Sequence, residues 1–121
     1  MRGGFHHEEE LPVPIAEVEK IWMDGELVDW ADAKIHVLSH ALHYGSGVFE
    51  GIRAYETARG AAVWHLEEHL HRLFRSAKLY HMDLPFSHDE LVRATKELIR
   101  VNGLTSCYVR PIAFRGTARW V

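Results

Sequence analysis

The alternation of hydrophobic and polar residues predicts two hairpins in the first half of the chain. Two short apolar runs within residues 20–30 flank Asp24-Gly25, a dipeptide that favours a tight turn because it tolerates positive φ. A longer apolar stretch, residues 48–55, and a returning stretch, residues 61–64, flank the turn-forming residues 57–60. We therefore expect each pair of stretches to form antiparallel strands. Between the hairpins, residues 39–42 have the pattern of one short helical turn before a Gly-Ser-Gly segment.

The second half of the chain changes to helical spacing and then returns to a strand. Apolar residues recur every three or four positions, with charged residues largely on the other side, at Leu66, Leu70, Leu73, Phe74, Ala77 and Tyr80. After Pro85, a Ser87-x-x-Glu90 capping box predicts the start of a second helix, which ends at Asn102-Gly103. Residues 107–114 form a β-rich apolar run. This order predicts an α+β domain, a mostly antiparallel sheet with two helices packed on one side.

Strand periodicity assigns the side chains of these runs to two faces. In residues 48–55 the first face holds Phe49, Gly51, Arg53 and Tyr55, and the second holds Val48, Glu50, Ile52 and Ala54. In the last run Tyr108, Arg110, Ile112 and Phe114 share a face. Arg53 and Arg110 therefore lie among apolar neighbours. A buried guanidinium without a partner is costly, so each arginine either extends to water or faces an anion.

Composition excludes several classes of protein. The 121 residues are 47% hydrophobic and 26% charged, which fits one domain with its own core. A net charge of -3 without a basic stripe argues against nucleic acid as a partner, and no apolar run is long enough to span a membrane. The first residues lack the hydrophobic core of a secretory signal, so we expect a cytoplasmic protein. Residues 1–14 are polar, acidic and proline-containing, and we expect a flexible arm ahead of a domain over residues 15–121.

Cysteine and histidine suggest little independent chemistry. The single cysteine, Cys107, has no internal disulfide partner and lies in an apolar run, so we interpret it as a small buried hydrophobe. Among the 10 histidines, His65 and His69 fit the H-x-x-E-H pattern of inverted zinc peptidases. On a helix both imidazoles would share a face and could bind one metal ion, but no third ligand is evident and we assign no metal site.

A longer motif gives a specific resemblance. Residues 40–53 read His-Ala-Leu-His-Tyr-Gly-Ser-Gly-Val-Phe-Glu-Gly-Ile-Arg, which resembles the signature of branched-chain amino acid aminotransferases, the pyridoxal phosphate enzymes of fold type IV. Further matches follow in order at residues 21–25, 32–34, 68–73, 76–78 and 104–111, so that the resemblance covers roughly residues 19–116. His69 matches a position that this family commonly fills with histidine. D-amino acid aminotransferases and aminodeoxychorismate lyases share the fold type, but the Tyr-Gly and Glu-Gly-Ile-Arg elements favour the branched-chain pattern.

The resemblance implies roles for six residues. In similar enzymes the match to Arg110 helps to receive the distal carboxylate of glutamate, the matches to Phe49 and Tyr108 line the space for the branched side chain, and Gly51 leaves room. The match to Tyr44 reaches the neighbouring subunit's pocket, which implies a homodimer. The match to Arg72 binds the cofactor phosphate, although from the residues alone Arg72 is an ordinary exposed helical arginine. Pyridoxal phosphate, leucine, isoleucine, valine and 2-oxoglutarate or glutamate are thus the implied cofactor and substrates.

The lysine that this chemistry requires has no counterpart here. Transamination uses a lysine that binds pyridoxal phosphate covalently and moves a proton. Of the four lysines, Lys20, Lys34, Lys78 and Lys96, none matches that position, and in similar enzymes it lies in a larger domain downstream. We therefore expect the N-terminal small domain or a fragment of an aminotransferase, inactive alone and without stably bound cofactor. A non-catalytic association module remains the alternative.

Overall fold

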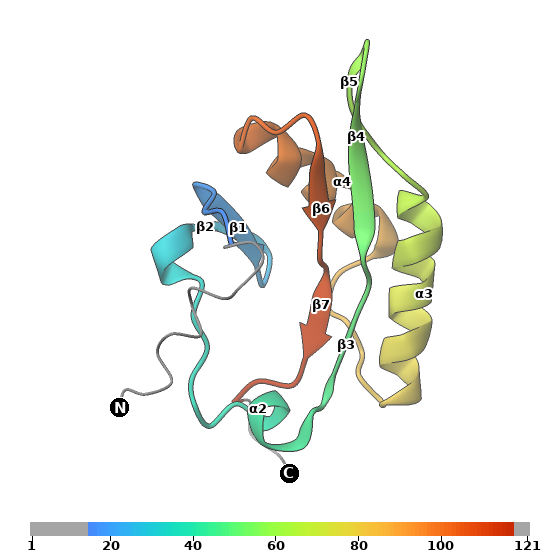
Figure 1. Ribbon diagram of the computed structural model, residues 1–121. Coiled ribbons are helices and arrows are strands. Elements are labelled where there is room, and N and C mark those ends of the chain that lie inside the picture. The colour runs from blue at the N-terminus through green and yellow to red at the C-terminus, as the bar shows by residue number, and fades with distance from the viewer. Residues whose placement is uncertain (1–14, 118–121) are drawn as a thin grey trace, which may run out of the picture.

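The computed structural model describes residues 15–117, and every strand pairing in this part is antiparallel (Figure 1). The strands form the centre of the molecule, two long helices cover one side of them, and a separate hairpin lies beside the far end of the second helix. The chain is therefore α+β, as predicted. The expected arm over residues 1–14 and the last four residues, 118–121, lie outside the described residues.

The first predicted hairpin is confirmed with its turn. β1 (Lys20–Met23) pairs with β2 (Glu26–Asp29) through Asp24-Gly25, where both residues have positive φ, 51° and 93°. A short 3-10 helix (Trp30–Asp32) follows, and the predicted helical turn is α2 (His40–Tyr44). Gly45 ends α2 in the left-handed conformation, at φ 67°, where glycine carries no Cβ penalty.

The two long strands expected at residues 48–55 and 107–114 are each interrupted once. The first is divided into β3 (Gly47–Phe49) and β4 (Ile52–Thr57), and the second into β6 (Cys107–Val109) and β7 (Ile112–Phe114). The interruptions face one another, because the Glu50 amide donates to the Pro111 carbonyl at 3.1 Å between the β4–β6 and β3–β7 ladders. Proline has no amide hydrogen, so the regular ladder cannot continue through it.

The predicted second hairpin is present with shifted bounds. β5 (Gly60–Val63) pairs with β4 across the two-residue turn at Ala58 and Arg59. The face assignment of residues 48–55 is confirmed: Val48, Glu50, Ile52 and Ala54 are buried, whereas Phe49, Gly51, Arg53 and Tyr55 are exposed. The alternation of buried and exposed side chains thus continues through the break at Glu50-Gly51.

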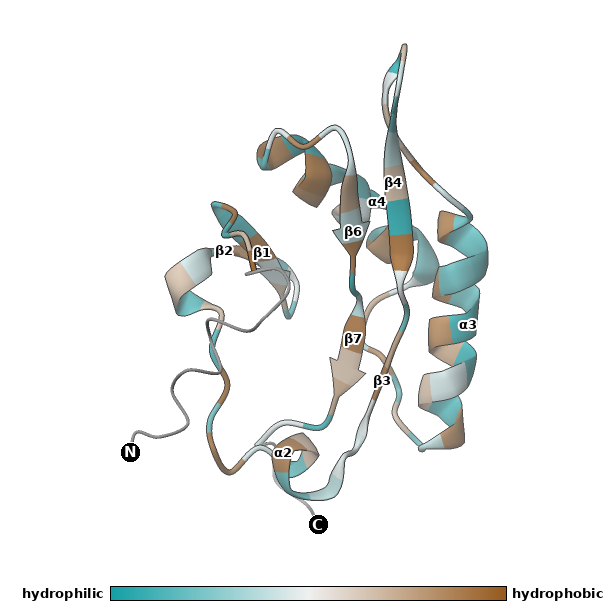
Figure 2. Ribbon diagram, in the orientation of Figure 1, coloured by the Kyte–Doolittle hydropathy of each residue, from teal (hydrophilic) through white to brown (hydrophobic). Residues whose placement is uncertain are grey.

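The two predicted helices are α3 (Leu66–Leu79) and α4 (His88–Val101). The capping box of α4 is complete, because the Glu90 amide donates to Ser87 Oγ and the Ser87 amide donates to the Glu90 carboxylate. Apolar residues of α3 lie on its strand side, and hydrophilic residues lie on its outer side (Figure 2). The buried core joins the sheet to α3 through Val48, Ile52, Leu66, Leu70, Leu73, Ala77 and Met82. Tyr80, predicted to belong to the apolar side of α3, lies just beyond its end and is exposed.

Asn102 attaches the first hairpin to the end of α4. Its Oδ1 accepts the Lys20 amide at 2.9 Å, and its Nδ2 donates to the carbonyls of Lys20 and Leu98, each at 3.0 Å. The side chain thereby pairs with β1 as a neighbouring strand would.

We expect Asn102→Ala to lower the free energy of unfolding by about 1–3 kcal/mol, because it leaves part-buried backbone groups of Lys20 without partners. Urea titration followed by tryptophan fluorescence measures the change. Asn102→Asp, which keeps the acceptor but loses the donor, should fall between the alanine variant and the original. An alanine variant as stable as the original would show that water replaces these bonds without cost.

Candidate functional site

Four residues with predicted substrate roles meet on the open face of the sheet, opposite the helices. They are Phe49 at the end of β3, Gly51 in the interruption, Tyr108 on β6 and Arg110 in the second interruption. The Arg110 guanidinium lies 4.1 Å from the centroid of the Phe49 ring and 5.3 Å from that of Tyr108. Its Nη2 donates to Tyr108 Oη at 2.8 Å. Phe49 and Tyr108 remain 56% and 52% exposed, so this face is an apolar surface with one positioned cation.

Gly51 is required by the position of Tyr108. A Cβ at Gly51 would lie 2.2 Å from Tyr108 Oη and 3.1 Å from Cζ, well inside van der Waals contact. The room that glycine leaves is therefore occupied by the phenol of Tyr108, which crosses the interruption to reach Arg110. Room for a substrate at Gly51 stays a prediction, because the space at this position is taken up by Tyr108 itself.

A second cation, Arg53, lies on the same face. Its guanidinium is 5.9 Å from the centroid of the Tyr108 ring, so two cations lie near this ring. Both arginines are exposed, so each side chain extends to water, which is one of the two alternatives that the sequence left open. Among residues 15–117 no carboxylate forms an ion pair with Arg53 or Arg110, and the positive charge of this face is available to an anionic ligand.

Tyr44 lies apart from this group, on α2. It is 75% exposed, and its ring contacts that of His40 at 4.5 Å between centroids. Leu38 and Leu42, which are near it in the sequence, are also largely exposed. The predicted substrate residues therefore fall into two groups. Phe49, Gly51, Tyr108 and Arg110 form a cluster, whereas Tyr44 lies separately on α2.

Arg72 lies on α3 and binds Glu50, which comes from the helix side of the sheet. Arg72 Nε donates to Glu50 Oε2 at 2.8 Å, and Nη2 donates to Oε1 at 2.7 Å. His69 Nδ1 lies 2.8 Å from the same Oε1. The Glu50 side chain is only 4% exposed, whereas that of Arg72 is 59% exposed. A buried carboxylate is thus paired with a cation that extends to solvent.

The Arg72 hydrogen bonds lower the pKa of the Glu50 carboxyl below its usual value near 4.5, against the opposite effect of burial, and His69 lowers it further. Because the folded-state pKa is the lower one, ionised Glu50 stabilises the fold above about pH 4.5, and this contribution is lost as pH falls through the folded-state pKa.

We therefore expect Glu50→Gln to destabilise the domain near neutral pH and to differ progressively less from the original below about pH 4.5. Urea midpoints measured across this range test the sign. A stability difference that stays constant with pH would show that the loss comes from shape and packing, without a contribution from the ionised carboxylate.

Glu50 and His69 were not predicted as a functional pair. The sequence carried one signal for Glu50, since strand periodicity places a carboxylate among Val48, Ile52 and Ala54 on the side that packs against the helices. A charge on a core-facing position requires a partner. That partner could not be identified from periodicity alone, because the register of α3 against the strand depends on tertiary packing.

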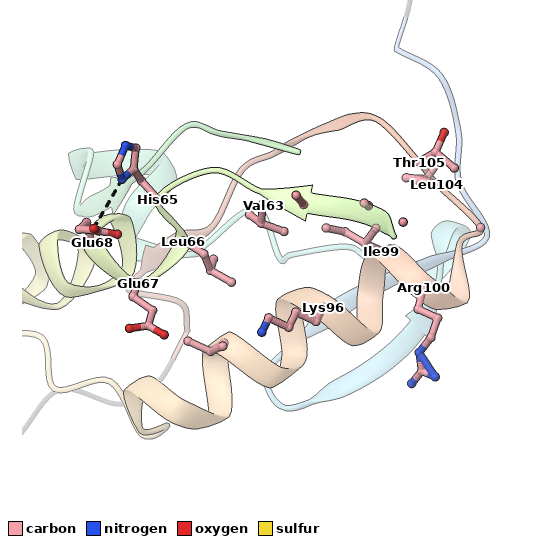
Figure 3. Close-up of a pocket in the computed structure, with 15 residues that line it drawn as sticks. Val63, His65, Leu66, Glu67, Glu68, Lys96, Ile99, Arg100, Leu104 and Thr105 are labelled. Carbon is pink, nitrogen blue, oxygen red and sulfur yellow. Dashed lines mark ion pairs between the residues drawn. The ribbon is translucent and has the colours of Figure 1, made fainter. Parts of the chain in front are cut away.

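The zinc interpretation loses its geometric basis. His65 is the N-cap of α3 with left-handed backbone, φ 53°, and therefore lies outside the regular helical turns that contain His69. Its Nδ1 lies 3.5 Å from the Glu68 carboxylate, at the rim of a hollow between β5, the start of α3 and α4 (Figure 3). Within the described part of the chain, no group of three or more His, Cys, Asp or Glu side chains is placed to hold a metal ion.

Cys107 is half-buried in β6, and burial raises the pKa of its thiol, which disfavours the nucleophilic thiolate. None of the helices within residues 15–117 is long and apolar enough to cross a membrane.

The domain is α+β, with helices on one side of its strands and an apolar, cationic face on the other, and comparison with known proteins gives its family. Residues 47–121 match the model of the class IV aminotransferases, so the chain belongs to this family. It is 54% identical over 97 residues to the branched-chain-amino-acid aminotransferase of Pseudomonas aeruginosa, covering 80% of this chain and 32% of the relative. The corresponding Escherichia coli K12 protein is 51% identical over 100 residues, covering 83% of this chain and 32% of the relative.

Comparison with solved structures gives the same family as comparison with the sequence relatives. The T.th. branched-chain amino acid aminotransferase in complex with N-(5'-phosphopyridoxyl)-L-glutamate superposes with a TM-score of 0.82 at 53% identity, covering 84% of this chain and 34% of that one. The same enzyme has been solved with 4-methylvaleric acid. The chain spans about a third of the length of the curated relatives that it matches.

Proposed function

We propose that this chain is the N-terminal part of a branched-chain-amino-acid aminotransferase and that the open face of its sheet recognises the substrate side chain. The observation that carries the proposal is the position of Arg110. Its guanidinium lies over the Phe49 ring and is bonded to Tyr108 Oη, on a face where no described carboxylate neutralises it. The family membership and the names of the relatives support the reaction class.

This arrangement suits two kinds of side chain. Apolar carbon of leucine, isoleucine or valine gains free energy by covering exposed aromatic surface. The distal carboxylate of glutamate instead requires a hydrogen-bonding cation, and a planar guanidinium serves both of its oxygens. Because Arg110 is held against Phe49 and Tyr108, its flat face adds to the apolar surface while its free N–H groups remain for glutamate. One face thus accepts both the branched side chain of leucine, isoleucine or valine and the acidic side chain of glutamate.

The residues present also fit the phosphate of pyridoxal phosphate. Arg72 has two donors on Glu50 and further donors exposed to solvent, which is the chemistry that an oxyanion requires. When bound, the cofactor supplies the electron sink for transamination. In this proposal Arg72 holds its phosphate, and the face with Arg110 orients the side chain of the substrate. The covalent lysine would have to come from outside residues 1–121, since none of the four lysines matches that role.

Partnering through α2 is part of the proposal. Leu38, Leu42 and Tyr44 form an apolar projection, and each is more than half exposed. Such surfaces favour association, and a second copy of the same surface gives a two-fold dimer.

We expect this chain to self-associate as a dimer through residues 42–48. Leu42→Glu should shift it toward the monomer, because it places two negative charges at the contact, where they repel each other. Sedimentation equilibrium at micromolar concentration measures the shift. Lys96→Glu, an exposed substitution on α4, serves as the control and should leave the dimer intact. A monomeric original chain would contradict the dimer proposal.

A hybrid enzyme tests the function itself. In this hybrid the present chain replaces the matching part of the Pseudomonas relative. We expect the hybrid to transfer the amino group of leucine to 2-oxoglutarate, whereas the isolated chain should show no turnover because it lacks the cofactor lysine.

The choice of substrate separates this proposal from its rivals within the fold type. Preference for D-alanine would indicate a D-amino acid aminotransferase, and conversion of aminodeoxychorismate would indicate a lyase. A folded, cofactor-loaded hybrid that accepts neither leucine nor these substrates would instead favour a non-catalytic association module.

A further inference from the structure

Glu50 is a buried carboxylate whose position is fixed from several directions. Its backbone amide donates to Pro111 across the interrupted ladder, so the main chain is held within the sheet. Its two carboxylate oxygens lie within hydrogen-bond distance of three nitrogens, Nε and Nη2 of Arg72 and Nδ1 of His69. Within residues 15–117 it is the only buried acidic residue. Burial of a carboxylate is costly, and three charge-assisted or polar bonds offset that cost.

The bonds to Glu50 leave a defined edge of Arg72 unused. A guanidinium has five N–H groups, and the Nε and Nη2 groups that face Glu50 account for two of them. Of the remaining three, one on Nη1 and one on Nη2 point together from the adjacent edge of the plane. The base of the side chain is also fixed, because α3 is anchored in the core by the buried Leu70 and Leu73 on either side. Arg72 therefore presents a second two-nitrogen fork, in one orientation, from a side chain that is 59% exposed.

His69 constrains the carboxylate from the side of α3 as well. It lies three residues before Arg72, on the same side of the helix, and its ring nitrogen approaches the same oxygen that accepts Arg72 Nη2. For this bond Nδ1 carries the proton. The carboxylate therefore cannot rotate without losing at least one of its partners.

We propose that Glu50 is a positioning residue, which holds the Arg72 guanidinium so that its free edge is presented to a phosphate group. The inference rests on the proposed phosphate role of Arg72. An exposed arginine loses rotamer freedom when it binds an anion, and a side chain that is already fixed loses less. Positioning therefore increases phosphate affinity, even though the negative charge of Glu50 by itself would decrease it. These two effects have opposite signs, which makes them separable.

Titration of this chain with inorganic phosphate distinguishes the two effects. The ¹⁵N signal of Arg72 Nε–H reports both binding and side-chain order. We expect Glu50→Gln to weaken phosphate binding by about fivefold and to increase the motion of Arg72 Nε, because the amide cannot accept both donors. Glu50→Asp keeps the charge but shortens the reach, and it should weaken binding about threefold by the same loss of positioning. Arg75→Gln, an exposed change on the same helix, should leave the affinity unchanged.

The variants also separate failure of this inference from failure of the phosphate site. Arg72→Gln should abolish saturable binding; unchanged binding in that variant, or none in the original chain, would overturn the phosphate site itself. If Arg72 is required but Glu50→Gln binds phosphate as tightly or more tightly, positioning is overturned. Glu50→Asp decides the same question if the glutamine variant does not fold, because a charge effect alone predicts unchanged affinity for aspartate.

Discussion

Arg110→Met in the hybrid enzyme is expected to lower kcat/KM for glutamate by on the order of 10- to 100-fold while changing that for leucine by less than about threefold. Methionine keeps apolar contact with Phe49 but cannot bond a carboxylate, so only the acidic substrate loses a partner. Half-reactions with each amino acid, followed by the cofactor absorbance, give the two values separately.

Arg53→Met is the matched control for that experiment. Arg53 carries the same charge on the same face, 5.9 Å from the centroid of the Tyr108 ring, and has no assigned contact with substrate. If glutamate recognition depended only on the total charge of the face, both variants would lose it equally. Equal losses in the two variants, or equal losses of glutamate and leucine in Arg110→Met, would reject a specific role for Arg110.

Gly51→Ala should impair catalysis far more than stability. The added methyl would lie 2.2 Å from Tyr108 Oη, so the phenol must move. Because Tyr108 is half exposed, its ring can swing toward solvent, and we expect the free energy of unfolding to change by less than about 1 kcal/mol. The displaced ring would leave Arg110 and cover the open face, and we expect kcat/KM to fall by on the order of tenfold for leucine and more for glutamate.

A second substitution tests that explanation of the Gly51→Ala result. Tyr108→Phe removes the clashing oxygen, so the double variant should recover much of the leucine activity but not the glutamate activity, which also depends on the bond from Tyr108 to Arg110. Gly116→Ala controls for the loss of a glycine, since nothing lies within 4 Å of a Cβ at that position. A double variant with no recovery for leucine would contradict steric displacement of Tyr108.

Sequence patterns predicted the elements better than their internal breaks. Turn chemistry at Asp24-Gly25 and the capping box at Ser87 and Glu90 are encoded within a few residues, and both are confirmed. The breaks at Gly51 and Pro111 depend on two strands that are distant in sequence and meet at that point. Pro111 was visible in the sequence, but nothing local showed which backbone group it faces.

The candidate site, like the fold, was predicted from the sequence only in part. Period-two alternation placed Phe49 with Gly51 on one face and Tyr108 with Arg110 on another, and the resemblance assigned all four to the substrate pocket. Periodicity could not show that Tyr108 reaches across Gly51 to bond Arg110, because this depends on strand register and on side-chain rotamers. For the same reason the pairing of Glu50 with Arg72 emerged only from the packing of α3 against the strand.

The most direct test of the central claim, that the open face of the sheet contacts the substrate side chain, is ¹⁹F NMR of the hybrid enzyme labelled with 3-fluorotyrosine. The Tyr108 signal is assigned by its disappearance in Tyr108→Phe, and 4-methylvaleric acid, which was bound in the T.th. relative, serves as a non-reacting probe. We predict that the Tyr108 signal shifts saturably with the probe while that of Tyr80, beyond the end of α3, does not. Saturable inhibition by the probe with an unchanged Tyr108 signal would place the side-chain site elsewhere and contradict the account.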